Sequence, residues 1–134
     1  LTGGSGVDIF GYSATADGGA IASNQTASAA GVSGDTLEDF VSGTDKFNFV
    51  SSAFGGLSTG TLTSGTNFSI ITEAYRGDNA GTNSEFTAGD PTFIFDSTDT
   101  LYYDSNGSSA GYTVVATMTG TNITATDVEI VSAF

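Results

Sequence analysis

Short apolar runs alternate with clusters of small polar residues along the whole chain. The runs are rich in β-branched and aromatic side chains, and Gly, Ser, Asn and Asp separate them. Such runs are typical of β-strands, because branched and aromatic side chains pack well on a pleated surface. The pattern predicts strands over Ile9–Tyr12, Thr36–Val41, Lys46–Val50, Phe68–Thr72, Thr92–Phe95, Thr100–Tyr103, Tyr112–Met118 and Val128–Val131.

The clearest local element is a hairpin within Phe93–Tyr103. Two of the apolar runs flank the polar tetrapeptide Asp96-Ser97-Thr98-Asp99. A short polar turn between two strand-like runs is typical of an antiparallel hairpin. We therefore expect these two strands to pair with each other.

Helix signals are few. Asp35-Thr36-Leu37-Glu38 has the spacing of a helix capping box, but Gly43 follows soon and no 3.6-residue apolar period surrounds it, so at most a short helix is expected. The stretches Ala14–Gly34 and Arg76–Gly89 are small and polar and predict long surface loops. The 134 residues are enough for one domain with a modest core, and we expect that domain to be all-β.

The charge balance is strongly acidic. Fifteen Asp and Glu residues face only Lys46 and Arg76, which gives a net charge of -13. Such a charge repels phosphate backbones and anionic lipid heads, so we expect no nucleic-acid partner. The chain also has no apolar stretch near the roughly 20 residues that cross a bilayer, so we expect no membrane insertion. Solubility alone is an alternative reason for an acidic surface.

The chain contains no cysteine and no histidine. Disulfides, thiolate metal sites and Ser-His-Asp catalysis are therefore excluded within it. Neighbouring carboxylates such as Glu38 and Asp39 lie in an expected turn, with no sign of a pocket around them. We expect that the protein is not an enzyme.

The first candidate site is Gly3-Gly4-Ser5-Gly6-Val7-Asp8-Ile9-Phe10. It fits the glycine-rich nonapeptide repeat that binds calcium in parallel β-helices. Glycines allow tight turns that aim carbonyl oxygens inward, and an aspartate adds a hard anionic oxygen. Gly4, Gly6 and Asp8 are therefore candidate calcium ligands. The alternative is a plain glycine turn with Asp8 as an exposed cap.

A second acidic cluster spaces Asp35, Asp39 and Asp45 around apolar anchors, so that their carboxylates could converge on one cation. The alternative is a solvated turn in which Lys46 pairs with a neighbouring acid, a contact worth at most about 1 kcal/mol.

The third candidate is Asp104-Ser105-Asn106-Gly107-Ser108, preceded by Asp96 and Asp99 on the hairpin. Alternating oxygen side chains before a glycine resemble the opening of a calcium loop, although the distal Glu of an EF-hand is missing. Asp96, Asp99, Asp104 and Asn106 are therefore further candidate ligands. An ordinary Asx-turn explains the pentapeptide equally well.

Taken in order, these segments resemble the C-terminal region of the RTX family of hemolysin-type calcium-binding proteins, which includes serralysin-like protease tails and bacterial surface-layer proteins. Residues 1–13 look like the last glycine-rich repeat, residues 34–54 like the segment that caps the roll, and residues 90–134 like a closing hairpin and a secretion-signal-like end. The matching motifs include Asp39-Phe40, Asp45-Lys46, Leu-Tyr-Tyr-Asp ending at Asp104, and Thr-Ala-x-Asp ending at Asp127. Only one repeat is present, and Asn48 and Asn106 stand where the family often has Asp.

The resemblance implies the end of a calcium-bound parallel β-roll followed by an antiparallel β-sandwich-like cap with long loops. It also implies a Ca²⁺-binding folding and secretion module at the C-terminus of a larger bacterial protein, with the parent polypeptide upstream. The module would be exported by type I secretion machinery and would act outside the cell or at its surface. One alternative is a structural or adhesive unit of a surface layer, biofilm matrix or adhesin that self-assembles or contacts the cell surface. Another is the noncatalytic or glycan-binding tail of a secreted enzyme, using Tyr75, Tyr102, Tyr103 or Tyr112.

Overall fold

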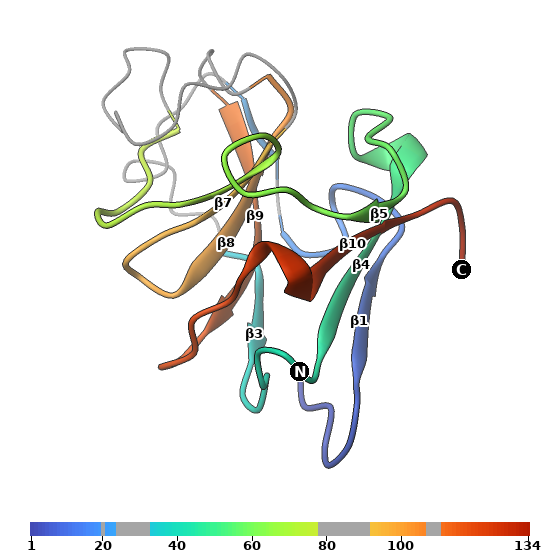
Figure 1. Cartoon of the computed structure of the whole chain (residues 1–134). Coiled ribbons are helices and arrows are strands. Elements are labelled where there is room, and N and C mark those ends of the chain that lie inside the picture. The colour runs from blue at the N-terminus through green and yellow to red at the C-terminus, as the bar shows by residue number, and fades with distance from the viewer. Residues whose placement is uncertain (20, 24–32, 78–91, 107–110) are drawn as a thin grey trace.

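Two mixed β-sheets make up most of the structure (Figure 1). The computed structural model describes residues 1–19, 21–23, 33–77, 92–106 and 111–134. Helical structure in this part of the chain is limited to two short 3-10 helices, η1 and η2, over Ser51–Ala53 and Ala125–Asp127. The predicted all-β fold class is therefore confirmed.

The first sheet, sheet A, has the strand order β1-β4-β10-β5. Its strands are β1 (Ile9–Tyr12), β4 (Lys46–Val50), β10 (Val128–Val131) and β5 (Gly60–Thr61). Strands β1 and β10 both run parallel to β4, whereas β5 runs antiparallel to β10. Burial alternates along β1 and β4, so the sheet turns one face to the core and the other outward.

The second sheet, sheet B, has the order β2-β9-β8-β7-β6, and β3 also pairs with β9. Strands β7 and β8 pair antiparallel through a short turn, which confirms the predicted hairpin. Strands β3 and β6 run parallel to β9 and β7, so sheet B is mixed and not antiparallel as expected. The strands are β2 (Ile21–Ser23), β3 (Asp35–Leu37), β6 (Phe68–Ile70), β7 (Thr92–Phe95), β8 (Thr100–Asp104) and β9 (Gly111–Met118).

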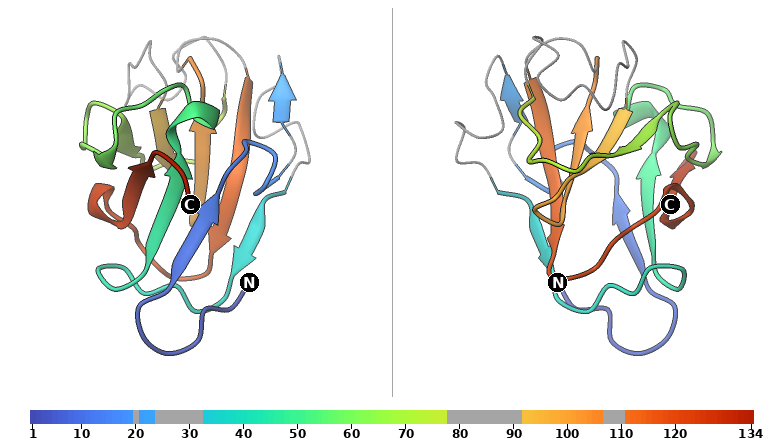
Figure 2. Two further views of the ribbon diagram at one scale, coloured as in Figure 1. Left: turned by 90° about the vertical axis from the view of Figure 1, so that its right-hand side faces the viewer. Right: turned by 60° about the vertical axis from the view of Figure 1, so that its left-hand side comes forward.

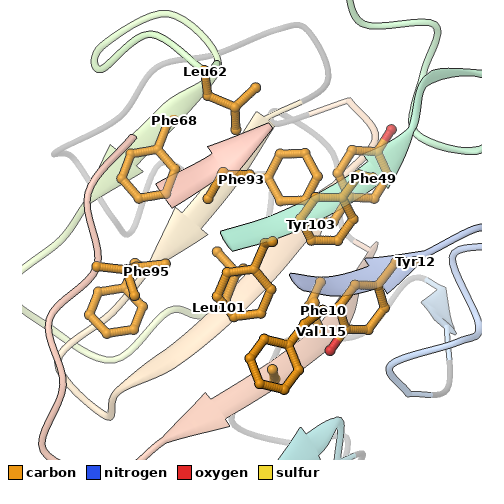
Figure 3. Packing of buried hydrophobic residues seen from close by; sticks show 14 of the residues in the cluster. Phe10, Tyr12, Phe49, Leu62, Phe68, Phe93, Phe95, Leu101, Tyr103 and Val115 are labelled. Carbon is orange, nitrogen blue, oxygen red and sulfur yellow. The ribbon is translucent and has the colours of Figure 1, made fainter. Parts of the chain in front are cut away.

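Aromatic rings join the two sheets into one core (Figure 3). Phe49 of β4 is fully buried, and its ring centroid lies 4.5 Å from that of Phe93 on β7. It also lies 5.1 Å from Tyr12 on β1 and 4.8 Å from Phe54. Offset and edge-on ring pairs add to the free energy of apolar burial. Eight phenylalanines lie in this core, so aromatic packing supplies cohesion that a chain without cysteine cannot obtain from disulfides.

A smaller apolar cluster covers the outer face of sheet B. Ile71 and Tyr75, which follow β6, pack there against Ile94, Tyr102 and Tyr112. Both faces of the β7–β8 hairpin are therefore buried. This explains why its strands are continuous apolar runs without alternation.

The region around β3 differs from its prediction. The predicted strand over Thr36–Val41 forms only at Thr36 and Leu37, where β3 ends, and the residues that follow form a turn and no helix. Strands β2 and β5 were not predicted, and β2 lies inside the expected loop Ala14–Gly34. Residues 20 and 24–32 of that loop and most of Arg76–Gly89 lie outside the described residues. The calcium-bound roll stays a prediction. The parallel pairing of β1 with β4 is compatible with it.

Candidate functional site

Two loops that are far apart in the sequence lie together at one end of the molecule (Figure 2). The glycine loop, residues 2–8, leads into β1, and the acidic loop, residues 38–45, leads into β4. The Asp39 carboxylate accepts hydrogen bonds from the Gly3 N–H at 2.9 Å and the Gly4 N–H at 2.8 Å. These donors, that of Gly3 first, hold the pKa of Asp39 below its usual 3.8.

Asp45 makes the second connection between these loops. Its side chain is buried, and its Oδ1 and Oδ2 accept the N–H groups of Asp8 at 3.0 Å and Val41 at 2.8 Å. The Lys46 N–H returns a bond of 2.9 Å to the Asp8 carbonyl. The glycine loop is therefore fixed at the point where β1 begins to pair with β4.

The Asp8 side chain curls back over the glycine loop. A Cβ atom added to Gly3 would lie 2.6 Å from Asp8 Oδ2, so a glycine is what leaves room for this carboxylate. Gly4 and Gly6 have φ values of 102° and 120°, a region that glycine adopts without strain. Asp8 is only partly exposed, and no donor from the described residues bonds to its carboxylate. Its two oxygens therefore remain available to a cation.

Asp35 stands apart from Asp39 and Asp45. It lies on β3, and its Oδ2 accepts a 3.2 Å hydrogen bond from the Tyr12 hydroxyl. Burial, and then the charges of Asp35 and Asp17, raise the pKa of Tyr12. Each acid of the second candidate cluster thus bonds a different donor, and within the described ranges no three acidic side chains gather closely enough to hold a metal.

Two further candidate ligands, Asp96 and Asp99, lie in the turn between β7 and β8 of sheet B. Asp96 is buried and accepts the N–H groups of Tyr75 at 2.8 Å and Thr98 at 2.9 Å. Asp99 has a φ of 58°, and its Oδ2 accepts the Gly120 N–H at 2.9 Å. These two carboxylates hold the hairpin turn and the segments beside it.

Asp104 and Asn106 are joined by a local turn. Asp104 is buried and accepts the Asn106 N–H at 3.0 Å and the Tyr75 hydroxyl at 2.5 Å. The first of these bonds is the Asx-turn that was the alternative to a calcium loop. The end of the third candidate motif, Gly107 and Ser108, lies outside the described residues.

Sequence reasoning missed the role of one heavily bonded carboxylate, that of Asp127. It is fully buried and accepts bonds from Ser42 Oγ at 2.6 Å, the Gly43 N–H at 2.8 Å and the Thr124 N–H at 2.9 Å. Lys46 Nζ lies 3.5 Å from Asp127 Oδ1 and forms an ion pair with it. Burial alone would raise the pKa of Asp127, but the bonds from Ser42, Thr124 and Gly43 outweigh it and lower the pKa below 3.8. The spacing Thr-x-x-Asp, here a true capping box, was the available signal.

The candidate ligands differ in how well they suit calcium. Calcium takes about six to eight oxygen ligands, among them carboxylates and backbone carbonyls. The glycine loop offers the available Asp8 carboxylate beside a turn in which Gly4 and Gly6 have positive φ. Asp96 and Asp104 are buried and already bonded, so a cation there would have to displace their donors. The glycine loop is therefore the best candidate.

Comparisons with protein-family models, curated proteins and solved structures found no match. In the described part of the chain, no helix has the length and apolar character needed to cross a membrane.

Proposed function

We propose that the chain is a calcium-stabilised folding module of a secreted bacterial protein. The observation that carries this proposal is the contact between the glycine loop and the acidic loop. Asp39 reaches across 36 positions of sequence to bond Gly3, and Asp45 fixes the backbone of Asp8. Together they present the Asp8 carboxylate over a glycine turn, where it has no donor from the described residues.

Electrostatics supports a divalent ligand. A net charge of -13 on 134 residues makes the acids repel one another in the folded state. A bound cation offsets this repulsion, whereas an extended chain offers it no formed site. Extracellular calcium modules have dissociation constants of about 10⁻⁴ to 10⁻³ M, so millimolar calcium adds roughly 0.4–1.4 kcal/mol per site.

Calcium-dependent stability is compatible with a protein that leaves the cell. Calcium would add little stability in the cytosol and more outside, where its concentration reaches the dissociation constant. Export with an upstream parent polypeptide through type I secretion machinery, the route implied by the family resemblance, is part of this proposal. In its finer form, the glycine loop and β1 are the last turn of a parallel roll. The parallel pairing of β1 with β4 supports that arrangement.

The glycan-binding alternative has lost the residues on which it rested. Tyr75, Tyr103 and Tyr112 are each 3 % exposed, and Tyr102 is 9 % exposed. Sugar rings stack on open aromatic faces, and these tyrosines are packed against other side chains. No other observation on the described residues favours a glycan.

Thermal melting with and without calcium tests the proposal. Millimolar calcium should raise Tm by roughly 2–6 °C over a chelator-treated sample, given about 4 °C per kcal/mol for a domain of this size. Asp8→Asn should remove most of that rise while leaving Tm in chelator almost unchanged. Glu73→Gln, the same charge change at an exposed acid away from the glycine loop, should keep the full response. Identical melting curves with and without calcium would sink the proposal.

A further inference from the structure

The C-terminal segment, Thr121–Val131, completes sheet A. Its strand β10 lies between β4 and β5, and the segment contributes Ile123, Val128 and Ile130 to the core, each at most 1 % exposed. Figure 1 shows it in red, where it passes from the end of β9 to sheet A. The strands of sheet B pair with one another without it. Opening of this segment would therefore divide sheet A but leave the pairing of sheet B in place.

The acidic loop is what this segment docks on. The Asp127 carboxylate accepts the Ser42 hydroxyl at 2.6 Å and the Gly43 N–H at 2.8 Å. The Thr121 hydroxyl donates to the Phe40 carbonyl at 3.2 Å. These bonds join residues that lie 81 to 85 positions apart in the sequence. The docked position of the C-terminal segment thus depends on the shape of the acidic loop.

The same loop also holds the glycine loop. Asp39 accepts two N–H groups of the glycine loop, and Asp45 accepts the N–H of Asp8. The two sets of contacts interleave, because positions 39 and 45 bond to the glycine loop and positions 40, 42 and 43 between them bond to the C-terminal segment. The acidic loop therefore cannot release one partner without disturbing its grip on the other.

We propose that calcium at the glycine loop tightens the docking of the C-terminal segment, with the acidic loop as the coupling element. This inference rests on the proposed calcium site at Asp8. When the segment opens, Asp127 leaves the turn at Gly43 and the acidic loop is free to move. Asp39 and Asp45 then no longer hold the glycine loop in the form that presents the calcium site. Calcium therefore binds the docked state more tightly and, by linkage, makes the open state rarer.

The size of the effect follows from the same linkage. If the open state does not bind calcium, its population falls by the factor 1 + [Ca²⁺]/Kd, which is about tenfold at roughly ten times Kd. The segment therefore opens more often where calcium is scarce and less often where it is abundant. The fold persists in both conditions, because opening is confined to sheet A.

Single introduced thiols test this inference, because the chain has no cysteine of its own. Val128→Cys places a thiol on β10, and Val115→Cys makes the same change on β9, where the side chain is 1 % exposed. In chelator, a thiol reagent should label position 128 about tenfold or more faster than position 115, after correction for the global stability of each variant measured in urea. Calcium at roughly ten times Kd should slow labelling at position 128 about tenfold.

Further variants in the Val128→Cys background trace the coupling. Asp8→Asn should abolish the slowing by calcium while leaving the labelling rate in chelator almost unchanged. Ser42→Ala removes a bond to Asp127, so it should speed labelling in chelator about threefold or more. Ser51→Ala is its matched control, because the Ser51 hydroxyl bonds to the Leu57 carbonyl, away from the C-terminal segment, and labelling should change less than about twofold.

The outcomes separate this inference from the proposed function. Calcium that raises Tm but leaves labelling at position 128 unchanged would overturn the coupling and leave the calcium site standing. Equal corrected rates at positions 128 and 115 would mean that the segment opens only with the whole domain, and would also overturn it. Equal effects of Ser42→Ala and Ser51→Ala would refute docking through the acidic loop. If calcium changed neither Tm nor labelling, the proposed function and this inference would fall together.

Discussion

Replacing Asp127 should destabilise the protein more than replacing any exposed acid. Its carboxylate connects the loop before β4 to the segment before β10, through Ser42, Gly43 and Thr124. In Asp127→Ala the Gly43 and Thr124 N–H groups lose their acceptor inside the fold, and each unsatisfied buried donor costs about 1–3 kcal/mol. Lys46 also loses its ion-pair partner. The expected loss is about 3–5 kcal/mol in the free energy of unfolding, a large share of a typical domain's stability of about 5–15 kcal/mol.

Urea unfolding followed by circular dichroism measures this loss directly, and thermal melting should show Tm lower by about 10–20 °C. Asp17→Ala is the matched control, because Asp17 also accepts several bonds but is exposed and serves only its own turn. Its loss should be clearly smaller. A loss below about 1 kcal/mol for Asp127→Ala, or one no larger than that of the control, would refute the reasoning.

Acid titration gives Asp127 a second test with a definite sign. Its folded pKa lies below 3.8, so as pH falls the unfolded chain takes up this proton first. The stabilisation from Asp127 is therefore complete above the unfolded pKa and is lost as pH falls through the folded one. Asp127→Asn should remove this part of the acid sensitivity. An unchanged stability profile below pH about 4 would contradict the assignment.

Three further perturbations test the core, the tyrosines and the glycine loop. Phe49→Ala should cost about 3–5 kcal/mol in urea unfolding, because its ring contacts both sheets. Burial, with help from neighbouring carboxylates, raises the pKa of Tyr102 and of Tyr103 to about 12. The free energy of unfolding should thus be constant up to pH about 10 and fall at higher pH, because the unfolded chain loses these protons first. The phenolate absorbance of the folded protein should likewise rise only above pH about 10. Gly3→Ala should push the Asp8 carboxylate aside and weaken the calcium response in melting curves, and a full response would contradict the placement of calcium there.

Strand positions were predictable where local chemistry and tertiary packing agree. Strands β1, β4, β7 and β10 begin and end at the predicted residues, because each is an apolar run bounded by turn-forming residues. The prediction failed over Thr36–Val41, where Phe40 reaches the core from a turn. An apolar residue in a buried turn has the same sequence signal as one in a strand. The two-residue strand β5 is too short to leave any pattern.

The candidate site was predictable in its residues but not in their partners. Asp39 and Asp45 were singled out for their spacing, and the structure does bring them to the glycine loop. Their donors in the glycine loop lie 35 to 37 positions away, and those of Asp127 up to 85, so a local pattern could not identify them. A carboxylate that caps a distant loop and one that binds a cation look alike in sequence. Only the fold separates Asp8, which is available, from Asp39 and Asp45, which are already bonded.

Because Asp39 and Asp45 are already bonded and only Asp8 is available, the effect of calcium on the stability of the fold is limited. In a zinc finger the metal creates the fold, because nothing else holds its ligands together. Here Asp39, Asp45 and Asp127 already close the loops with backbone donors, and aromatic packing supplies the core. A cation at Asp8 would therefore add to a fold that exists without it. Calcium should accordingly shift the melting temperature by a few degrees and should not convert an unfolded chain into a folded one.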